Sequence, residues 1–465
     1  MKRFLFILLI PLLVLAIWDI KWVNHNRWSF PITNYGIWGF DIPSQFAGGS
    51  WPRPLRNFYI LGAGLIVGGI LDGDTLVSVG YDLSNGTSEM VPTLTFYWRN
   101  GYLDSADRIY KYPEDWPPPK KRFPMAPIMP LSEADFWCCF CDSDPSYHRP
   151  NDTRPMGIDI TLTCYLFSDT IAQDFFFLKY EIFNHNDYPI NNIYLGIAFD
   201  GDVGAYFDDM YGLILDKTFR IRIDNETINA RIKNVAFIFD SDNRENPSRV
   251  WERGTPGAVA VAHLYNSLGI EQISACKKIT IWQAPETDIE KYLVLAGYDH
   301  ITRRYEPYDT LDDILGDKTF IMSIGPFDLF PGSCEIFYFS VIAAPYGNEG
   351  APPNQRDTIP LAKACYLAEK VFRERILGVD IEEKDKKERS SEIYISPIVT
   401  KNKPLIMSNQ EKKINIEIYD INGKLLKVIN QKPPIYLDNR TRKGIYFIRI
   451  LKENKRSLKK IINLY

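Results

Sequence analysis

The chain has 465 residues, which is more than one domain core usually serves. Charged residues make up 24% of the chain and hydrophobic residues 45%, a composition that excludes an intrinsically disordered protein. Aromatic residues reach 14%, and together with many β-branched residues they favour a mostly β protein. The formal charge is −4, yet residues 411–465 hold 14 Lys and Arg against 5 Asp and Glu. Because these basic residues alternate with Ile, Tyr and Phe in strand rhythm, they predict the solvated face of a sheet, and we expect no nucleic-acid partner.

The N-terminal residues 1–16 read MKRFLFILLIPLLVLA, a basic start followed by an apolar run that ends in small residues. This pattern predicts a secretory signal peptide. A membrane anchor would need about 20 apolar residues, whereas Asp19 and Lys21 interrupt the run. The sequence therefore predicts a protein located outside the cell or on its outer surface.

Strand patterns dominate the predicted body, residues 17–378. Prolines are dense near residues 99–130, where they predict a long ordered loop or insertion rather than central strands. From Ile158 to about Ala344, alternating apolar segments separated by Asn, Asp and Gly predict a large antiparallel β-sandwich. Residues 359–377 instead repeat apolar positions every 3.6 residues, which predicts one helix that covers the sandwich.

Seven cysteines are present, three of them in the segment WCCFCD at residues 137–142. A structural zinc site usually has two CxxC-like pairs, and the sequence does not contain two. The pattern favours buried thiols and one or two disulfides, whose pairing cannot be deduced from the sequence.

The C-terminal part begins with a charged segment, residues 379–390, that is poor in core residues and predicts a linker. Residues 391–465 then contain about six short strand patterns, which suits a small immunoglobulin-like β-sandwich. An Asn-Gly pair, Asn422 and Gly423, predicts a tight turn between two of these strands.

Three segments of this part, NIEIYDINGKLLKVI, KGIYFIRI and KKIINLY, together resemble the C-terminal sorting domain of the type IX secretion system. That family usually has an Asn-Pro motif near the start of the domain, where this chain has Ser396-Pro397. The resemblance implies export across the outer membrane with the secretion machinery of that membrane as a partner, and it implies no activity for the body. The residues that match the family motif are Tyr419, Asp420, Gly423, Lys424, Gly444, Tyr446, Lys459 and Lys460.

An acidic stretch, FDGDVGAYFDDMYG, follows one of the strand patterns and places Asp200, Asp202, Asp208 and Asp209 within ten residues. Calcium takes six to eight oxygen ligands, so these carboxylates are candidate ligands for a structural Ca²⁺ ion, the one cofactor we consider. The spacing is not that of an EF-hand loop, which requires Gly at its sixth position. Asp and Gly are also common in ordinary β-turns, so a simple turn is the alternative interpretation.

The activity of the body has two competing interpretations. The sequence contains no Gly-x-Ser-x-Gly, His-Glu-x-x-His or phosphate-loop motif. Our first hypothesis is therefore a non-enzymatic protein with a structural, adhesive or glycan-binding role, whose partner would be a cell-surface glycan or protein. The alternative is an extracellular hydrolase of polysaccharide or peptide that uses a carboxylate pair, such as Asp72 and Asp74 or Asp200 and Asp202.

Five tryptophans lie among prolines and glycines rather than in regular strand alternation. If their rings are exposed, they could stack on sugars or on partner proteins. If they are buried, they would close the open ends of the sandwich. These residues are Trp28, Trp38, Trp51, Trp98 and Trp116.

Overall fold

The computed structural model divides the chain into two compact units, Met1–Ile376 and Leu377–Tyr465. We call the first unit the body and the second the C-terminal unit. The predicted signal peptide and the predicted linker lie outside the described residues. The structure describes residues 18–98, 104–148, 154–280, 283–310, 312, 314–345 and 358–378, and the strands of the C-terminal unit.

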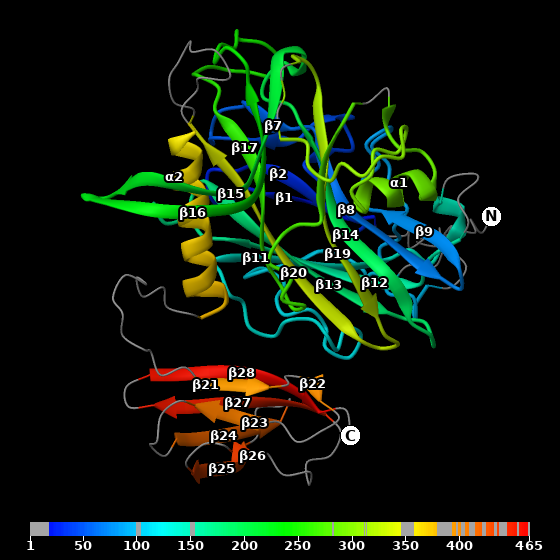
Figure 1. Cartoon of the computed structure of the whole chain (residues 1–465), viewed down its shortest axis with the longest axis vertical. Coiled ribbons are helices and arrows are strands. Elements are labelled where there is room, and N and C mark those ends of the chain that lie inside the picture. Colours follow the sequence, from blue (N-terminus) through cyan, green and yellow to red (C-terminus); the bar gives the residue numbers. More distant parts are fainter. Residues whose placement is uncertain are drawn as a thin grey trace, which may run out of the picture. The chain divides into compact units, whose positions relative to one another are not determined.

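The body is built from two eight-stranded antiparallel sheets (Figure 1). In order across the first sheet lie β1 (Ile20–Val23), β2 (Phe30–Thr33), β3 (Ile37–Trp38), β8 (Gly62–Leu71), β14 (Ile190–Gly201), β19 (Lys318–Leu329) and β18 (Ala275–Ile279), and β9 (Asp74–Val79) also pairs with β8.

The second sheet consists of β10 (Tyr110–Lys111), β11 (Ala134–Cys141), β12 (Ile158–Leu166), β13 (Phe175–Asn184), β20 (Cys334–Ala344), β17 (Ala258–Asn266), β16 (Glu226–Asp240) and β15 (Asp209–Ile223). Two short ladders add β4 (Phe40–Asp41) with β5 (Phe46–Ala47), and β6 (Gly49–Ser50) with β7 (Phe58–Ile60).

The main core lies between the two sheets, as alternation along β13 illustrates. Phe176 and Tyr180 point to one face of the strand and belong to this core, because successive side chains of a strand point to opposite faces. The ring of Phe176 stacks on Phe30 of the first sheet at 4.2 Å, and the indole N–H of Trp38 donates to the Tyr180 hydroxyl at 3.1 Å. The prediction of a mostly β protein with a large antiparallel sandwich is confirmed.

Helix α2 (Ile359–Val371) covers the outer face of the second sheet (Figure 1). Leu361, Cys365 and Ala368 recur on one side of the helix and are buried against that sheet. A π-helical turn (Phe372–Ile376) follows, in which the ring of Phe372 lies 5.0 Å from that of Tyr338. Residues on the opposite face of β13 join α2 in a second, smaller core. The apolar periodicity of the sequence predicted this covering helix.

A second helix, α1 (Asp288–Leu295), packs on the first sheet and was not anticipated. Its start is stabilised by a capping box in which the Thr287 hydroxyl accepts from the Glu290 N–H and the Glu290 carboxylate accepts from the Thr287 N–H. Its end is fixed to the sheet, because the Ser323 hydroxyl of β19 donates to the carbonyl of Leu295 at 2.6 Å.

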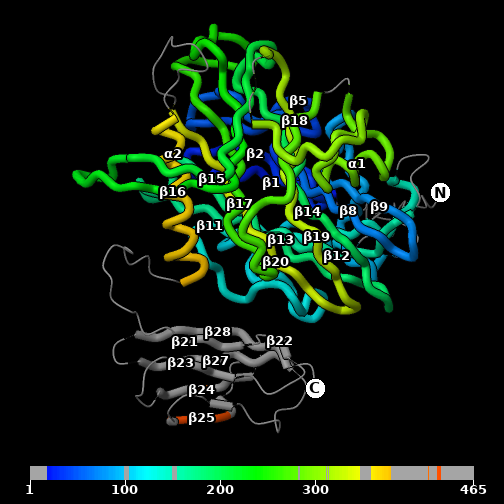
Figure 2. Tube along the Cα trace, in the orientation of Figure 1, coloured from blue at the N-terminus to red at the C-terminus, as the bar shows by residue number. Residues whose placement is uncertain are grey.

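Strands β15 and β16 form a long hairpin, and its turn projects beyond the sandwich (Figure 2). The register runs from Asp209 opposite Asp240 at the base to Ile223 opposite Glu226 next to the turn. The base of this hairpin therefore lies where the second sheet meets the loop that leaves β14.

All seven cysteines are free thiols in the structure, so the predicted disulfides are not formed. Six of the seven are buried. Among the described residues, no helix is both long enough and apolar enough to cross a membrane.

The C-terminal unit contains two small sheets. Within the described residues, the first has the strand order β21 (Ile393–Ser396), β23 (Leu405–Ser408) and β26 (Ile435–Tyr436). The second has the order β22 (Val399–Thr400), β28 (Lys455–Asn463), β27 (Gly444–Lys452), β24 (Ile414–Asp420) and β25 (Leu425–Gln431), and only the pair of β22 and β28 is parallel.

Candidate functional site

The four aspartates singled out in the sequence lie around one loop between the two sheets of the body. Asp200 is the penultimate residue of β14, and Asp202 follows the end of that strand. Asp208 ends a short 3-10 turn (Tyr206–Asp208), and Asp209 is the first residue of β15. The structure places three of the four in two separate groups and adds residues that are distant in the sequence.

Asp200 and Asp202 form a group with Asp317, and we call these three residues the aspartate trio. One carboxylate oxygen from each lies within 4.8 Å of the other two. Asp317 precedes β19, and antiparallel pairing of Asp200 with Thr319 brings the two chain segments together. The sequence contained no local signal for Asp317, because it lies more than a hundred residues from Asp200.

The trio contains buried oxygens that no donor of the described residues satisfies. Asp200 is only 4% exposed, and its Oδ2 accepts a hydrogen bond from the Tyr81 hydroxyl at 3.2 Å. Its Oδ1, the Oδ1 of Asp202 and the Oδ1 of Asp317 are buried without a hydrogen-bond partner in the described part of the chain. Such atoms are rare in folded proteins, because burial without a partner is costly.

The second group consists of Asp208, Asp240 and Glu245, whose carboxylate oxygens also lie within 4.8 Å of one another. The Oε1 of Glu245 accepts from the N–H of Ala205 at 2.6 Å, which holds the glutamate against the loop. Asp209 is fully buried and lies opposite Asp240 in the strand register of the hairpin, but it belongs to neither group.

Burial raises the pKa of every carboxyl group in this region for which a shift is resolved. It raises the pKa of Asp202 and of Asp240 to about 7, and that of Asp200 to well above its usual range, where the charge of Asp202 adds to the effect of burial. The pKa of Asp317 is raised by burial, although the charge of Lys318 opposes the shift. The region therefore favours bound protons or a bound cation, and its oxygen ligands suit calcium or magnesium better than a transition metal.

The other carboxylate pair suggested by the sequence lies at the turn of the β8–β9 hairpin. Asp72 and Asp74 are more than half exposed at the side chain. Both face the same guanidinium group, that of Arg154, at 3.4 and 3.5 Å. An exposed pair that shares one arginine forms a surface ion-pair network.

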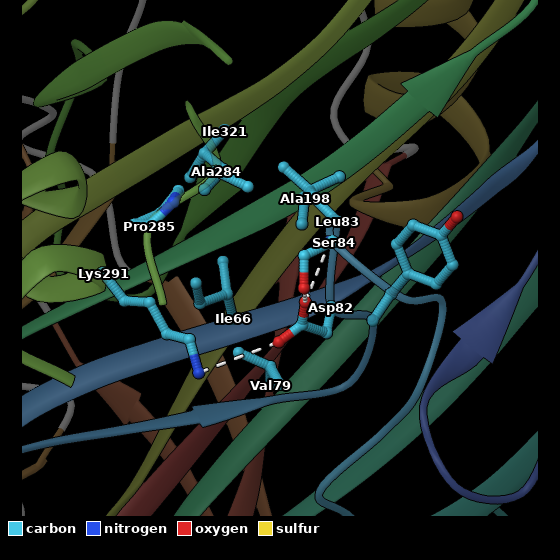
Figure 3. Close-up of a pocket in the computed structure, with 11 residues that line it drawn as sticks. Ile66, Val79, Asp82, Leu83, Ser84, Ala198, Ala284, Pro285, Lys291 and Ile321 are labelled. Carbon is cyan, nitrogen blue, oxygen red and sulfur yellow. Dashed lines mark hydrogen bonds and ion pairs between the residues drawn. The ribbon is translucent and has the colours of Figure 1, made fainter. Parts of the chain in front are cut away.

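A small hollow lies between α1 and the turn after β9 (Figure 3). Lys291 of α1 points toward Asp82, and its Nζ lies 3.8 Å from the carboxylate, while the other carboxylate oxygen of Asp82 accepts from the Ser84 hydroxyl at 2.6 Å (Figure 3). The free volume is about 10 Å³, close to what a single water molecule needs. The hollow is therefore too small for an organic ligand.

A larger depression, which we call the Trp22 groove, has a volume of about 320 Å³. Its walls include the rings of Trp22, Phe46 and Phe58 and the side chains of Arg56 and Arg249, together with Asp41 and several small residues. Trp22 is 44% exposed.

In the Trp22 groove, the side chains of Arg249, Phe46 and Phe58 pack against one another. The Arg249 guanidinium lies over the Phe46 ring, 3.9 Å from its centroid. The ring of Phe46 meets that of Phe58 edge to face at 5.7 Å.

The tryptophans considered in the sequence lie mostly inside the body. Trp28 and Trp38 are fully buried and Trp51 is 6% exposed, so these three rings belong to the core. Trp98 and Trp116 are half-buried. The exposed indole of the groove, that of Trp22, was not among the five.

The sorting-domain motif residues lie on neighbouring strands of the C-terminal unit. Tyr419 of β24 is opposite Phe447 of β27, and Asp420 is opposite Tyr446. Gly444 begins β27, and Lys459 and Lys460 lie on β28. Gly423 and Lys424 lie outside the described residues.

Residues 394–463 match the family model of the secretion system C-terminal sorting domain. This match confirms that the C-terminal unit carries a type IX sorting domain. A sorting domain of this kind directs export by the type IX pathway to the cell surface or the extracellular space, and the secretion machinery is therefore a partner. The match says nothing about the body.

The sequence has no significant match among curated proteins. Among solved structures, it is similar to a polysaccharide lyase with 8% identity and a TM-score of 0.28, over 96% of this chain and 46% of the other. It is also similar to the heparan sulfate lyase HepC from Pedobacter heparinus with 8% identity and a TM-score of 0.16, over 66% of this chain and 27% of the other. The chain spans less than half the length of these enzymes, and at such scores the likeness carries no argument about activity.

Proposed function

We propose that the exported body is a non-enzymatic binding protein that recognises a glycan in the Trp22 groove. The observation that carries this proposal is the convergence of one exposed indole and two arginine side chains on a depression of about 320 Å³. Depressions of that volume lie at the lower end of the range for small-molecule sites.

The ligand chemistry follows from the walls of the groove. Flat aromatic rings such as Trp22 offer an apolar face to the C–H groups of a sugar, and their rigidity limits the entropy lost on binding. Within the described residues, neither Arg56 nor Arg249 forms an ion pair with a carboxylate, so both guanidinium groups can bind oxygen atoms of a ligand. Because arginine binds carboxylate and sulfate groups in a bidentate manner, we expect acidic sugars to bind more tightly than neutral ones.

A hydrolytic role has less support from the positions of the carboxylates. Glycoside hydrolysis needs two carboxyl groups about 5 to 10 Å apart on opposite sides of the bond to be cleaved. The groove contains one carboxylate, Asp41. Asp200 is buried, and the pair of Asp72 and Asp74 lies at an exposed hairpin turn.

The test is binding of the purified full-length chain to an array of neutral, uronic-acid-containing and sulfated glycans, with release of reducing ends measured on the same samples. We expect binding without turnover, and a loss of about tenfold or more in affinity for Trp22→Ala. Phe330→Ala is the matched control, because that ring is also exposed but lies outside the groove. Binding to no glycan, or cleavage of any of them, would contradict the proposal.

A further inference from the structure

The aspartate trio presents an electrostatic problem that the described protein atoms do not solve. Each of the three carboxylates has an oxygen within 4.8 Å of an oxygen of the other two, so the charged groups repel one another unless protons or a cation lie between them. Lys318 is adjacent to Asp317, yet its Nζ lies 3.3 Å from a different carboxylate, that of Asp312. Within the described residues, no lysine or arginine forms an ion pair with any member of the trio.

Asp200 supplies a second, independent observation. Its side chain is almost wholly buried, and the Tyr81 hydroxyl holds one of its oxygens, so the carboxyl group is fixed in orientation. The other oxygen, Oδ1, has no hydrogen-bond donor among the described residues. A buried, oriented and unpartnered oxygen next to two further carboxylates is the arrangement expected of a metal ligand supported by an outer hydrogen bond.

We propose that Asp200, Asp202 and Asp317 bind one calcium ion, which links the end of β14 to the start of β19. The proposal is independent of the Trp22 groove. Asp208 and Asp209, the other two residues suggested by the sequence, are not ligands of this ion.

The size of the trio suits calcium. Calcium lies about 2.3 to 2.6 Å from its oxygen ligands, so oxygens up to about 5 Å apart can bind one ion, and those of the trio all lie within 4.8 Å of one another. Magnesium holds its ligands at about 2.0 to 2.1 Å in a stricter octahedron and retains several water molecules. Three protein carboxylates and no imidazole or thiolate ligand also disfavour zinc and copper.

The experiment measures thermal unfolding of the purified full-length chain after treatment with chelator. Addition of millimolar Ca²⁺ should raise Tm by about 5 °C, because a ligand that binds only the native state stabilises it. Mg²⁺ at the same concentration should raise Tm by less than half as much. Equal unfolding curves with calcium and with chelator, or equal shifts with calcium and magnesium, would overturn the proposal.

Two substitutions separate ion binding from general stability. Asp317→Asn should abolish the response to calcium, while its Tm in chelator should equal or exceed that of the wild type, because one of three repelling charges is gone. Asp72→Asn, at the exposed hairpin turn, should retain the full calcium response. If Asp317→Asn still shows that response, the assignment is wrong.

If Asp317→Asn fails to fold, terbium luminescence of the wild type provides a direct measurement. Tb³⁺ should bind the chelator-treated protein and should be displaced by calcium, with Tyr81 close enough to transfer excitation. A terbium signal that calcium does not displace, or the absence of any signal, would count against a calcium site at the trio.

Discussion

The ammonium nitrogen of Lys291 lies 3.6 Å from a carboxylate oxygen of Glu89, and each of these two residues is only 2% exposed. Asp82 is the second carboxylate beside the same ammonium, and the Nδ1 of His148 lies 3.9 Å from Glu89. The cluster joins α1 to the segment that follows β9. A buried ionic cluster of this kind is sensitive to the loss of any one partner.

We expect Lys291→Met to destabilise the body strongly, because it removes the ammonium group that lies beside the buried carboxylates of Glu89 and Asp82. Loss of one partner of a buried ion pair costs about 3 to 5 kcal/mol. Urea unfolding of the full-length variant measures this difference. Lys363→Met, on the exposed side of α2, should change the free energy of unfolding by less than about 0.5 kcal/mol.

A second prediction concerns Asp142, which is fully buried at the end of β11. Its two carboxylate oxygens accept from the N–H groups of Met156, Gly157 and Ile158 and from the Ser78 hydroxyl, at 2.6 to 3.1 Å. Asp142→Ala would remove the acceptor for all four donors.

Each buried donor that loses its partner costs about 1 to 3 kcal/mol, so we expect Asp142→Ala to lower the free energy of unfolding by about 3 kcal/mol or more. The measurement is again urea unfolding, with Asp187→Ala as an exposed control. A loss below about 1 kcal/mol would show that water replaces the carboxylate at little cost.

His263 predicts a pH dependence of stability. Burial lowers the pKa of this histidine to about 4 in the folded state, against about 6.5 in an unfolded chain, and Asn266 donates to its Nε2 at 3.2 Å. At a pH between about 4 and 6.5, His263 carries a proton in the unfolded chain but not in the folded protein. The stability contributed by neutral His263 is therefore complete above about pH 6.5 and is lost as the pH falls toward 4.

The difference should be visible against a variant that cannot titrate. Between pH 7 and pH 5, the wild type should lose about 2 kcal/mol more stability than His263→Gln, which lacks this ionisation. The comparison isolates His263, because the acidic groups titrate in both proteins. Parallel stability profiles for the two proteins would exclude a depressed histidine pKa.

Removal of residues 391–465 should abolish export. The sorting domain is the part of the chain that the secretion machinery recognises, so the truncated protein should accumulate inside the cell envelope, as cell fractionation would detect. Fusion of residues 377–465 to a signal-peptide-bearing reporter is the positive control, and the reporter should reach the outside. Continued export of the truncated chain would mean that a second signal lies in the body.

The second sheet was predictable from the sequence because its strands follow simple alternation. Along β12 and β13, alternate residues face the core between the sheets, and the other face adds Tyr165, Phe175 and Phe177 to the layer beneath α2. Both faces are buried, yet turn residues between the strands still marked their ends. The helix α2 was equally visible, since its buried residues repeat at the helical period.

Other features depended on contacts that local patterns do not encode. Asp317 joins Asp200 only through pairing of β14 with β19, so no local motif could link them. Trp22 lies in a short strand and became a groove residue only through packing of the β4–β5 and β6–β7 ladders nearby. For α1, a signal did exist, because Thr287 and Glu290 have the spacing of a capping box before an apolar run.

The central pairings of the body also bear on how fast it can fold. In the second sheet β13 pairs with β20, and in the first sheet β8 pairs with β14, so each pairing closes a loop of roughly a hundred residues or more. Such non-local topologies fold on the timescale of about milliseconds to seconds, far more slowly than helical bundles. A newly synthesised body therefore cannot complete its second sheet until β20 has emerged, and during that interval its aromatic-rich strands are exposed to aggregation.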